Sequence, residues 1–220
     1  MKRFSLRYAL LTYWLDQLWL PLAFWLLFAI ICLFMRDTVE MMNTTRAYLG
    51  AAVPLIGGVM AAYAVLDDPA LELRFATPIP TVTTLLERLG LTLVIQAISA
   101  LGFQALALLL GGEFSMFLTV WHLQLAWLLP TLALMALGCL AALATAQPTM
   151  GALCVGLVWI VEVIARGWLA RNAGKYFLVF MGALMPDHPD VLANHLTILG
   201  LSLVCLGAAW ALLRRQERYI

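Results

Sequence analysis

Glu162 and Arg166 are the residues of this chain best placed to do chemistry inside an apolar segment. A charged side chain within a membrane is costly and often functional. The spacing of four residues places both side chains on one face of a helix, where they can pair. Two interpretations stay open: a polar group in a substrate pathway or outer gate, and a locally neutralised pair with Arg166 extended toward the membrane surface.

Further polar residues interrupt two other apolar segments. Gln96 and Ser99 share one helical face, and His122 lies near the start of a later segment. Hydrogen bonds between packed helices explain such residues, and the wall of a translocation cavity is the alternative. The three histidines and four cysteines have no spacing typical of a metal site, so we expect none.

Motifs of membrane enzymes and of nucleotide-binding proteins are missing from the sequence. It contains no H-E-x-x-H, no G-x-S-x-G, no paired intramembrane aspartates and no G-x-x-x-x-G-K-[ST] phosphate loop. We therefore expect a chain that is not an enzyme and holds no cofactor itself. Any energy from ATP would have to enter through a partner.

Composition indicates that these residues belong to a membrane protein. Of the 220 residues, 64% are hydrophobic and 11% are charged, against roughly 45–50% and about 25% in soluble domains. The mean hydropathy is +0.96. These values exclude a soluble globular enzyme, a disordered chain and a nucleic-acid-binding protein.

The distribution of apolar residues predicts an all-α membrane protein with six transmembrane helices. About 20 mostly apolar residues cross the hydrocarbon core of a bilayer. The run Phe114–Val161 is too long for one helix. We expect it to divide at Pro148, since proline suits the first position of a helix. The predicted spans are 18–35, 47–66, 87–111, 117–146, 149–168 and 191–213.

The connections between these spans leave no room for a second domain, so residues 1–220 form a single transmembrane domain. Residues 1–17 predict an interfacial amphipathic helix, with a simple extension of the first span as the alternative. Residues 169–190 predict an extracytoplasmic loop with an interfacial or re-entrant segment. Eight Lys and Arg residues on the side of both termini, against five on the other, favour cytoplasmic termini.

Small residues spaced four apart predict close helix packing for the second span, where Gly58 is followed by Ala62. Two partners for that contact stay open. One is another helix of the same chain, and the other is a second copy across a dimer interface.

The segment 67–84 lies between the second and third spans and contains four charged residues. Asp68 can cap a short helix that starts at Pro69, and Pro78 disfavours helix at the residue before it. Thr84 and Glu87 fit a capping box that opens the third span. A short helix held off the membrane by a proline hinge suits docking of a cytoplasmic partner, and an ordinary amphipathic connector is the alternative.

This segment resembles the loop of permeases of type-2 ABC exporters. In those loops acidic residues and a Glu lead into a short helix that ends in a Thr-Pro or Leu-Pro pair. The order of the interfacial helix, six spans and extended outer loop is similar too. Many members have a Gly before the Glu, where this chain has Pro69-Ala70. Haem-exporter-type permeases have a related loop and a similar length, so the subfamily stays open. The matching residues are Asp67, Asp68, Glu72, Leu73, Thr77, Pro78, Ile79 and Pro80, followed by Arg88.

The resemblance implies that the segment 68–76 is a coupling helix seated in a cleft of a separate ABC ATPase subunit, which would bind ATP and Mg. It also implies a second permease chain, identical or homologous, in a bacterial inner or plasma membrane. The chain would then form half of a substrate pathway. The residues implied in ATPase coupling are Asp67, Asp68, Leu71, Glu72, Arg74, Phe75, Thr77 and Pro78.

Two alternatives come from other functional classes. A stand-alone secondary transporter needs an internal repeat and intramembrane residues that couple to an ion. No convincing repeat is visible, and Glu162 stands alone. A non-transporting membrane scaffold or assembly factor needs neither a cavity nor nucleotide.

Overall fold

The structure is a computed structural model that describes residues 15–35, 37–66, 81–112, 114 and 119–214. Within these ranges the secondary structure is entirely helical. In the part of the chain that the structure describes, five helices are long and apolar enough to cross a membrane, which indicates an integral membrane protein. The first predicted span, 18–35, corresponds to α2 (Leu15–Phe34), whose apolar part, Leu18–Phe34, is shorter than these five helices.

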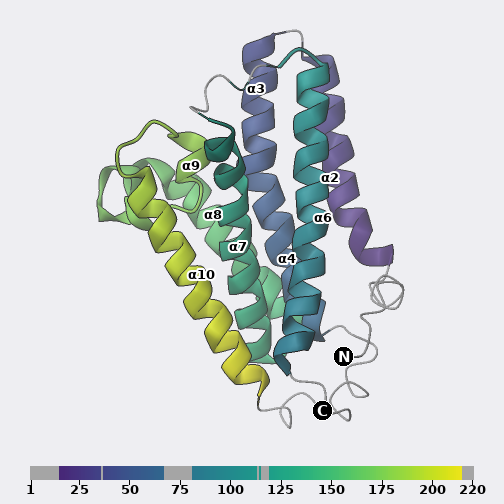
Figure 1. The fold of residues 1–220 in the computed structure, drawn as a ribbon, viewed down its shortest axis with the longest axis vertical. Helices are drawn as coiled ribbons and strands as arrows, with labels where there is room; N and C mark the ends of the chain where they lie inside the picture. The colour runs from purple at the N-terminus through teal and green to yellow at the C-terminus, as the bar shows by residue number, and fades with distance from the viewer. Residues whose placement is uncertain (1–14, 36, 67–80, 113, 115–118, 215–220) are drawn as a thin grey trace.

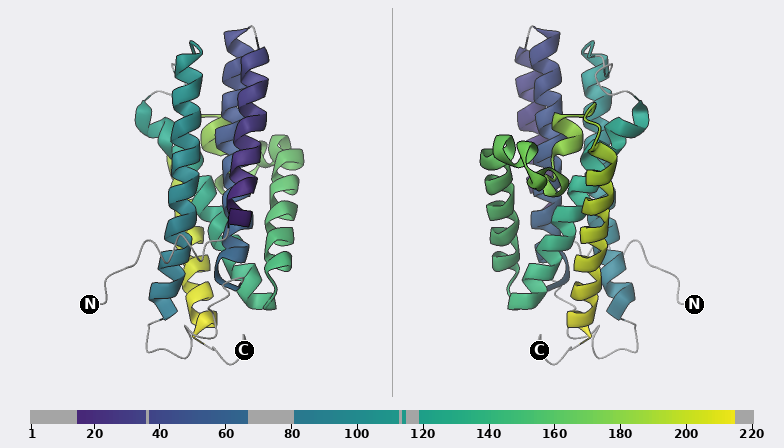
Figure 2. Two further views of the ribbon diagram at one scale, coloured as in Figure 1. Left: turned by 90° about the vertical axis from the view of Figure 1, so that its right-hand side faces the viewer. Right: turned by 90° about the vertical axis from the view of Figure 1, so that its left-hand side faces the viewer.

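The helices run alternately up and down the long axis of the molecule (Figure 1). One half contains α2 and α6, together with a continuous helix made of α3, η1 and α4. The other half contains α7, α8 and α10, with two short helices, η2 and α9, between α8 and α10 (Figure 2). The bounds are α3 Thr38–Ala47, η1 Tyr48–Ala52, α4 Val53–Leu66, α6 Thr81–Leu109, α7 Val120–Thr145, α8 Pro148–Arg171, η2 Ala173–Phe177, α9 Met181–Leu184 and α10 Val191–Leu213.

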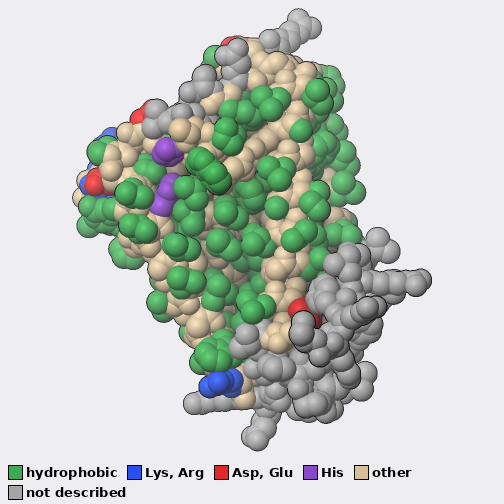
Figure 3. Space-filling view, in the orientation of Figure 1, with side chains coloured by type: hydrophobic (Ala, Val, Ile, Leu, Met, Phe, Trp, Pro, Cys, Tyr) green, Lys and Arg blue, Asp and Glu red, His purple; other side chains and the backbone are tan. Residues whose placement is uncertain are grey.

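The α3–α4 helix and α7 form the centre of the fold. Of their most apolar windows, 72% and 61% are buried, against 17% in α8 and 22% in α10. The outer helices therefore present large apolar side chains outward, such as Ile98 of α6, Ile164 of α8 and Leu203 of α10. Such side chains cover the face seen in Figure 3, as expected of a surface solvated by lipid.

The second span starts at Thr38 and not near residue 47 as predicted. The Asp37 side chain accepts a hydrogen bond from the Val39 N–H at 3.0 Å and caps the helix. Further along, the π turn η1 ends at Ala52, two residues before Pro54. Proline has no N–H to donate to the carbonyl four residues earlier, which accounts for a wider turn at this position.

The capping box predicted at Thr84 is wrong, because α6 already begins at Thr81 and Thr84 lies inside it. The predicted loop 67–84 is correspondingly shorter. The division of the long apolar run at Pro148 is confirmed. Pro148 opens α8, and the preceding Ala146 ends α7 in the left-handed conformation with φ of 56°.

Small residues bring α4, α7 and α8 into close contact within the chain. A Cβ atom at Gly58 of α4 would lie 2.7 Å from Val155 Cγ1 of α8, and one at Gly151 of α8 would lie 2.7 Å from the Gly138 carbonyl oxygen of α7. Neither position has room for a side chain. Of the two partners left open for the second span, the structure shows packing within one chain.

Candidate functional site

The predicted coupling segment falls almost wholly on residues 67–80, which lie outside the described residues. The same holds for residues 1–14 of the predicted interfacial helix, whereas residues 15–17 open α2. The coupling residues there therefore stay predictions: Asp67, Asp68, Leu71, Glu72, Arg74, Phe75, Thr77 and Pro78. The structure does place the two points where the segment attaches, the end of α4 and the start of α6.

Both attachment points lie at the end of the molecule where α10 also ends (Figure 1). Arg88, the eighth residue of α6, is only 5% exposed. At the end of α10 the Arg214 guanidinium lies over the Trp210 ring, 4.2 Å from its centroid. An Arg–Trp pair of this kind is typical of a helix end at a membrane surface.

An apolar groove of about 500 Å³ opens between α6, α7 and α10 near this end. Leu89 and Leu93 of α6, Met135 of α7, and Leu206 and Trp210 of α10 contribute to its walls. Among the lining residues none is charged. Its size lies within the range of about 300–1,000 Å³ that is typical of ligand pockets.

Gln96 and Ser99 make contacts between helices, as the hydrogen-bond interpretation predicted. The Ser99 hydroxyl and the Tyr48 hydroxyl are 2.6 Å apart and join α6 to η1. The Gln96 amide nitrogen lies 3.1 Å from the Met60 sulfur and joins α6 to α4. Both side chains are thus engaged in helix packing.

Two further polar residues, Gln104 of α6 and Gln124 of α7, form a pair in which each amide donates to the other, at 3.4 and 2.9 Å. The Gln124 oxygen also accepts from the Trp127 indole N–H at 2.8 Å. His122 is engaged locally, because its Nδ1 lies 2.7 Å from the Thr119 hydroxyl at the start of α7.

Glu162 does not pair with Arg166. Its carboxylate accepts a hydrogen bond from the Val179 N–H at 2.7 Å and a second from the backbone of Phe180, in the connection between η2 and α9. The side chain is only 8% exposed. The prediction of a pair within α8 was wrong because backbone N–H groups seventeen residues along the chain take the carboxylate instead. Glu162 therefore anchors the connection between α8 and α10.

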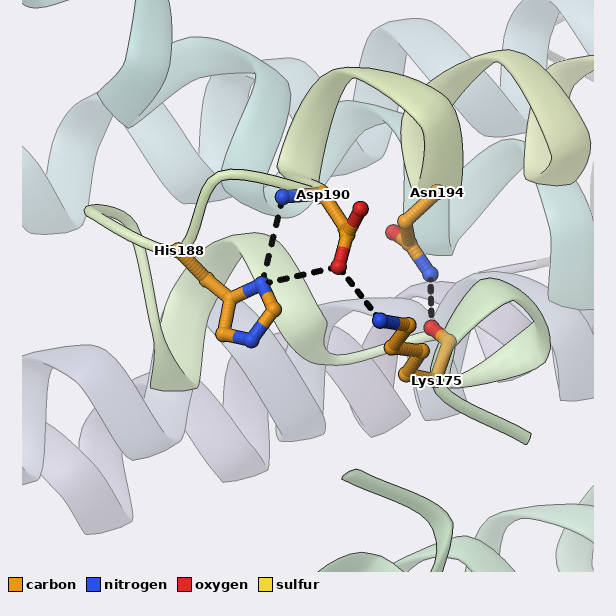
Figure 4. A network of polar contacts seen from close by, with 4 residues as sticks. All are labelled: Lys175, His188, Asp190 and Asn194. Atoms are coloured by element: carbon orange, nitrogen blue, oxygen red, sulfur yellow. Dashed lines mark hydrogen bonds and ion pairs between the residues drawn. The ribbon is translucent and has the colours of Figure 1, made fainter. Parts of the chain in front are cut away.

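The same connection is held at its other end by a polar network (Figure 4). Lys175 Nζ lies 2.5 Å from Asp190 Oδ2, and the Asn194 side chain donates to the Lys175 carbonyl at 2.8 Å and to the Leu178 carbonyl at 3.0 Å. His188 Nδ1 accepts from the Asp190 N–H at 3.2 Å. The hydrogen bond between the two charged groups raises the pKa of Lys175 and lowers the pKa of Asp190 from their ordinary values.

The structure does not bring the predicted pathway residues into one site. Gln96 and Ser99 face the centre of the fold, Glu162 faces the α8–α10 connection, and Arg166 lines a separate cavity. Across the described ranges, no three His, Cys, Asp or Glu side chains are grouped as metal ligands. No protein-family model matches the chain, and comparisons with curated proteins and with solved structures also give no match.

Proposed function

We propose that this chain is the membrane-spanning subunit of an ABC exporter and forms half of its substrate pathway. The proposed topology has six spans, of which α2 is the first. Both termini lie on the cytoplasmic side of a bacterial inner or plasma membrane. A separate ATPase subunit would bind ATP and Mg, and a second permease chain, identical or homologous, would complete the pathway. The chain itself would carry out no covalent chemistry.

The observation that carries the proposal is the concentration of charge between two apolar helices. Of the 25 Asp, Glu, Lys and Arg residues, four lie between α4 and α6, namely Asp67, Asp68, Glu72 and Arg74, and two more, Glu87 and Arg88, lie in the first three turns of α6. A short charged segment with a proline hinge is better suited to docking a protein partner than to serving only as a connection between two helices. Its likeness to the type-2 exporter loop supports an ATPase as that partner.

The arrangement of helices gives such a partner a direct mechanical route. The segment follows α4, whose span is the most deeply buried of the five and which contacts α6, α7 and α8. A force applied to this segment would reach the centre of the fold through α4. Because packed helices shift between discrete arrangements, closure of a partner ATPase could drive an alternation between inward-facing and outward-facing states.

The apolar groove between α6, α7 and α10 supports a pathway at the same end. It starts within the first turns of α6, immediately after the coupling segment. Its uncharged walls suit an apolar cargo.

A stand-alone secondary transporter is supported less well. It needs a carboxylate that can exchange a coupling ion within the membrane. The Glu162 carboxylate is already occupied by the backbone of the α8–α10 connection. A membrane scaffold remains the second alternative, and nucleotide dependence separates it from the exporter.

Co-purification from native membranes tests the proposal. The wild-type chain should bring down a protein that binds ATP, and the pair should hydrolyse ATP. Glu72→Ala and Phe75→Ala should lower both association and ATP turnover, whereas Asp187→Ala, at the opposite end of the fold, should lower neither. Absence of an ATPase, or insensitivity to both loop variants, would refute the exporter.

A further inference from the structure

A cavity of about 420 Å³ lies between the α3–η1 helix, the second half of α8 and α9. It is at the end of the molecule opposite the coupling segment, where α8 stands beside the α3–α4 helix (Figure 2). Two arginines line it, Arg46 from α3 and Arg166 from α8. Most of the remaining wall is apolar, with Ala51, Trp159, Val163 and Phe180 among its residues.

Both arginines carry charge that nothing in the cavity neutralises. Arg46 donates to the Ala183 carbonyl, at 2.8 Å from Nη2 and 3.1 Å from Nε, and to the Leu184 carbonyl at 3.1 Å. These acceptors are neutral, so they fix the guanidinium in place and leave its charge uncompensated. Arg166 forms no ion pair or hydrogen bond with the residues that the structure describes, and none of the cavity-lining residues is acidic.

The one carboxylate of α8, Glu162, is not among the residues that line this cavity. Glu162 directs its side chain to the Val179 N–H. An anion would therefore meet two cationic groups without a competing negative charge. Arginine is well suited to phosphate oxygens, because its planar guanidinium can donate two parallel hydrogen bonds.

A hydrogen bond braces the apolar wall of the cavity, and exposed apolar side chains adjoin it. The Trp159 indole N–H donates to the Ala51 carbonyl at 3.0 Å, which holds the ring against η1. The adjacent face of α8 is lipid-facing, with Ile164 79% exposed. A ligand with a charged head and an apolar chain could therefore enter sideways, and its chain would continue from the wall into the membrane.

We propose that this cavity binds an anionic glycerophospholipid, with its phosphate between Arg46 and Arg166 and the start of its acyl chain against Trp159 and Phe180. The charge of the cavity selects the head, and its apolar wall selects an amphiphile over a free anion. This lipid site does not depend on the exporter function. It would exist equally in a transporter of another class or in a scaffold.

Native mass spectrometry of the purified full-length chain can test this site with defined lipids. Dioleoyl phosphatidylglycerol should be retained in preference to dioleoyl phosphatidylcholine. Arg166→Gln should weaken that preference about fivefold, the effect of one basic side chain near an anionic membrane surface. Arg171→Gln is the matched control, since Arg171 is an exposed arginine of the same helix outside the cavity. Ala47→Trp, which keeps both arginines and fills the cavity, should also lower retention of phosphatidylglycerol.

Three results would overturn the lipid site. One is equal retention of the two lipids by the wild type, and another is an equal loss in Arg166→Gln and Arg171→Gln. The third is displacement of phosphatidylglycerol by inorganic phosphate at equal concentration, which would show that the cavity selects a free anion. A wild-type chain that associates with an ATPase but shows no lipid preference would refute the lipid site alone, so the two proposals fail separately.

Discussion

Substitution of Glu162 should release the connection between α8 and α10. In the wild type its carboxylate accepts from the Val179 N–H at 2.7 Å and from the backbone of Phe180. Glu162→Ala leaves two backbone N–H groups without an acceptor. Each buried unpaired group costs about 1–3 kcal/mol, so the upper estimate is about 6 kcal/mol. Because the same connection carries the exposed, charged Asp187, we expect water to pair part of the released groups and the cost to be about 2–4 kcal/mol.

Limited proteolysis measures this release. Trypsin cleavage after Lys175, within η2, follows the population of the opened connection when opening and closing are fast. A cost of about 2–4 kcal/mol corresponds to cleavage about 30- to 1,000-fold faster than in the wild type, at 1.36 kcal/mol for each factor of ten. The cleavage rate of Glu162→Gln should lie between those of the wild type and Glu162→Ala, because the amide has one acceptor oxygen in place of two and an NH2 group in place of the other.

The control variant is Asp187→Ala, which removes an exposed carboxylate from the same connection. It should leave the cleavage rate after Lys175 unchanged. Cleavage after the buried Arg88, near the start of α6 and far from this connection, reports general unfolding. It should stay slow in every variant. The role given to Glu162 is refuted if Glu162→Ala, like the control Asp187→Ala, is cleaved at the wild-type rate.

Two further predictions concern helix packing and pH. Gly58→Ala should destabilise the chain by about 1–3 kcal/mol through overpacking, measured by thermal unfolding in detergent. Gly200→Ala is the control and should not destabilise it, because the space around Gly200 is open. Equal effects of the two substitutions would contradict the close packing of α4. The depressed pKa of Asp190 stabilises the connection above its ordinary value of 3.8, and the raised pKa of Lys175 stabilises it below 10.5. Protection of residues 173–180 from hydrogen exchange, corrected for intrinsic rates, should therefore be level between these values and fall on either side. Asp190→Asn should lower it throughout that range, and unchanged protection would contradict the role of the pair.

Patterns local to the sequence predicted most of the helical architecture. Apolar runs located the bodies of the long helices, and Pro148 marked the division between α7 and α8. The second span begins earlier than predicted, and Asp37 and Glu40 at its start have the spacing of a capping box. The predicted start near residue 47 follows the stretch without charged residues, whereas the helix also includes Glu40 and Arg46.

The contacts of the charged residues could not be predicted in the same way. The spacing of Glu162 and Arg166 predicts a pair on one helix, but the donor that Glu162 binds lies on Val179. Arg46 likewise donates to carbonyls more than 130 residues away in the sequence. Such partners depend on how the α8–α10 connection folds back on the helices, which helical periodicity does not encode.

Site-specific crosslinking tests the proposed coupling to an ATPase most directly. A photoreactive amino acid replaces Phe75 in the coupling segment, and a second chain carries it at Asp187 as the control for the opposite end. After irradiation of native membranes, the Phe75 chain should form an adduct with a protein that contains a G-x-x-x-x-G-K-[ST] phosphate loop, and added ATP should change its yield. The Asp187 chain should form no such adduct. Adducts of the Phe75 chain only with lipid, with its own sequence or with proteins lacking that loop would contradict the account.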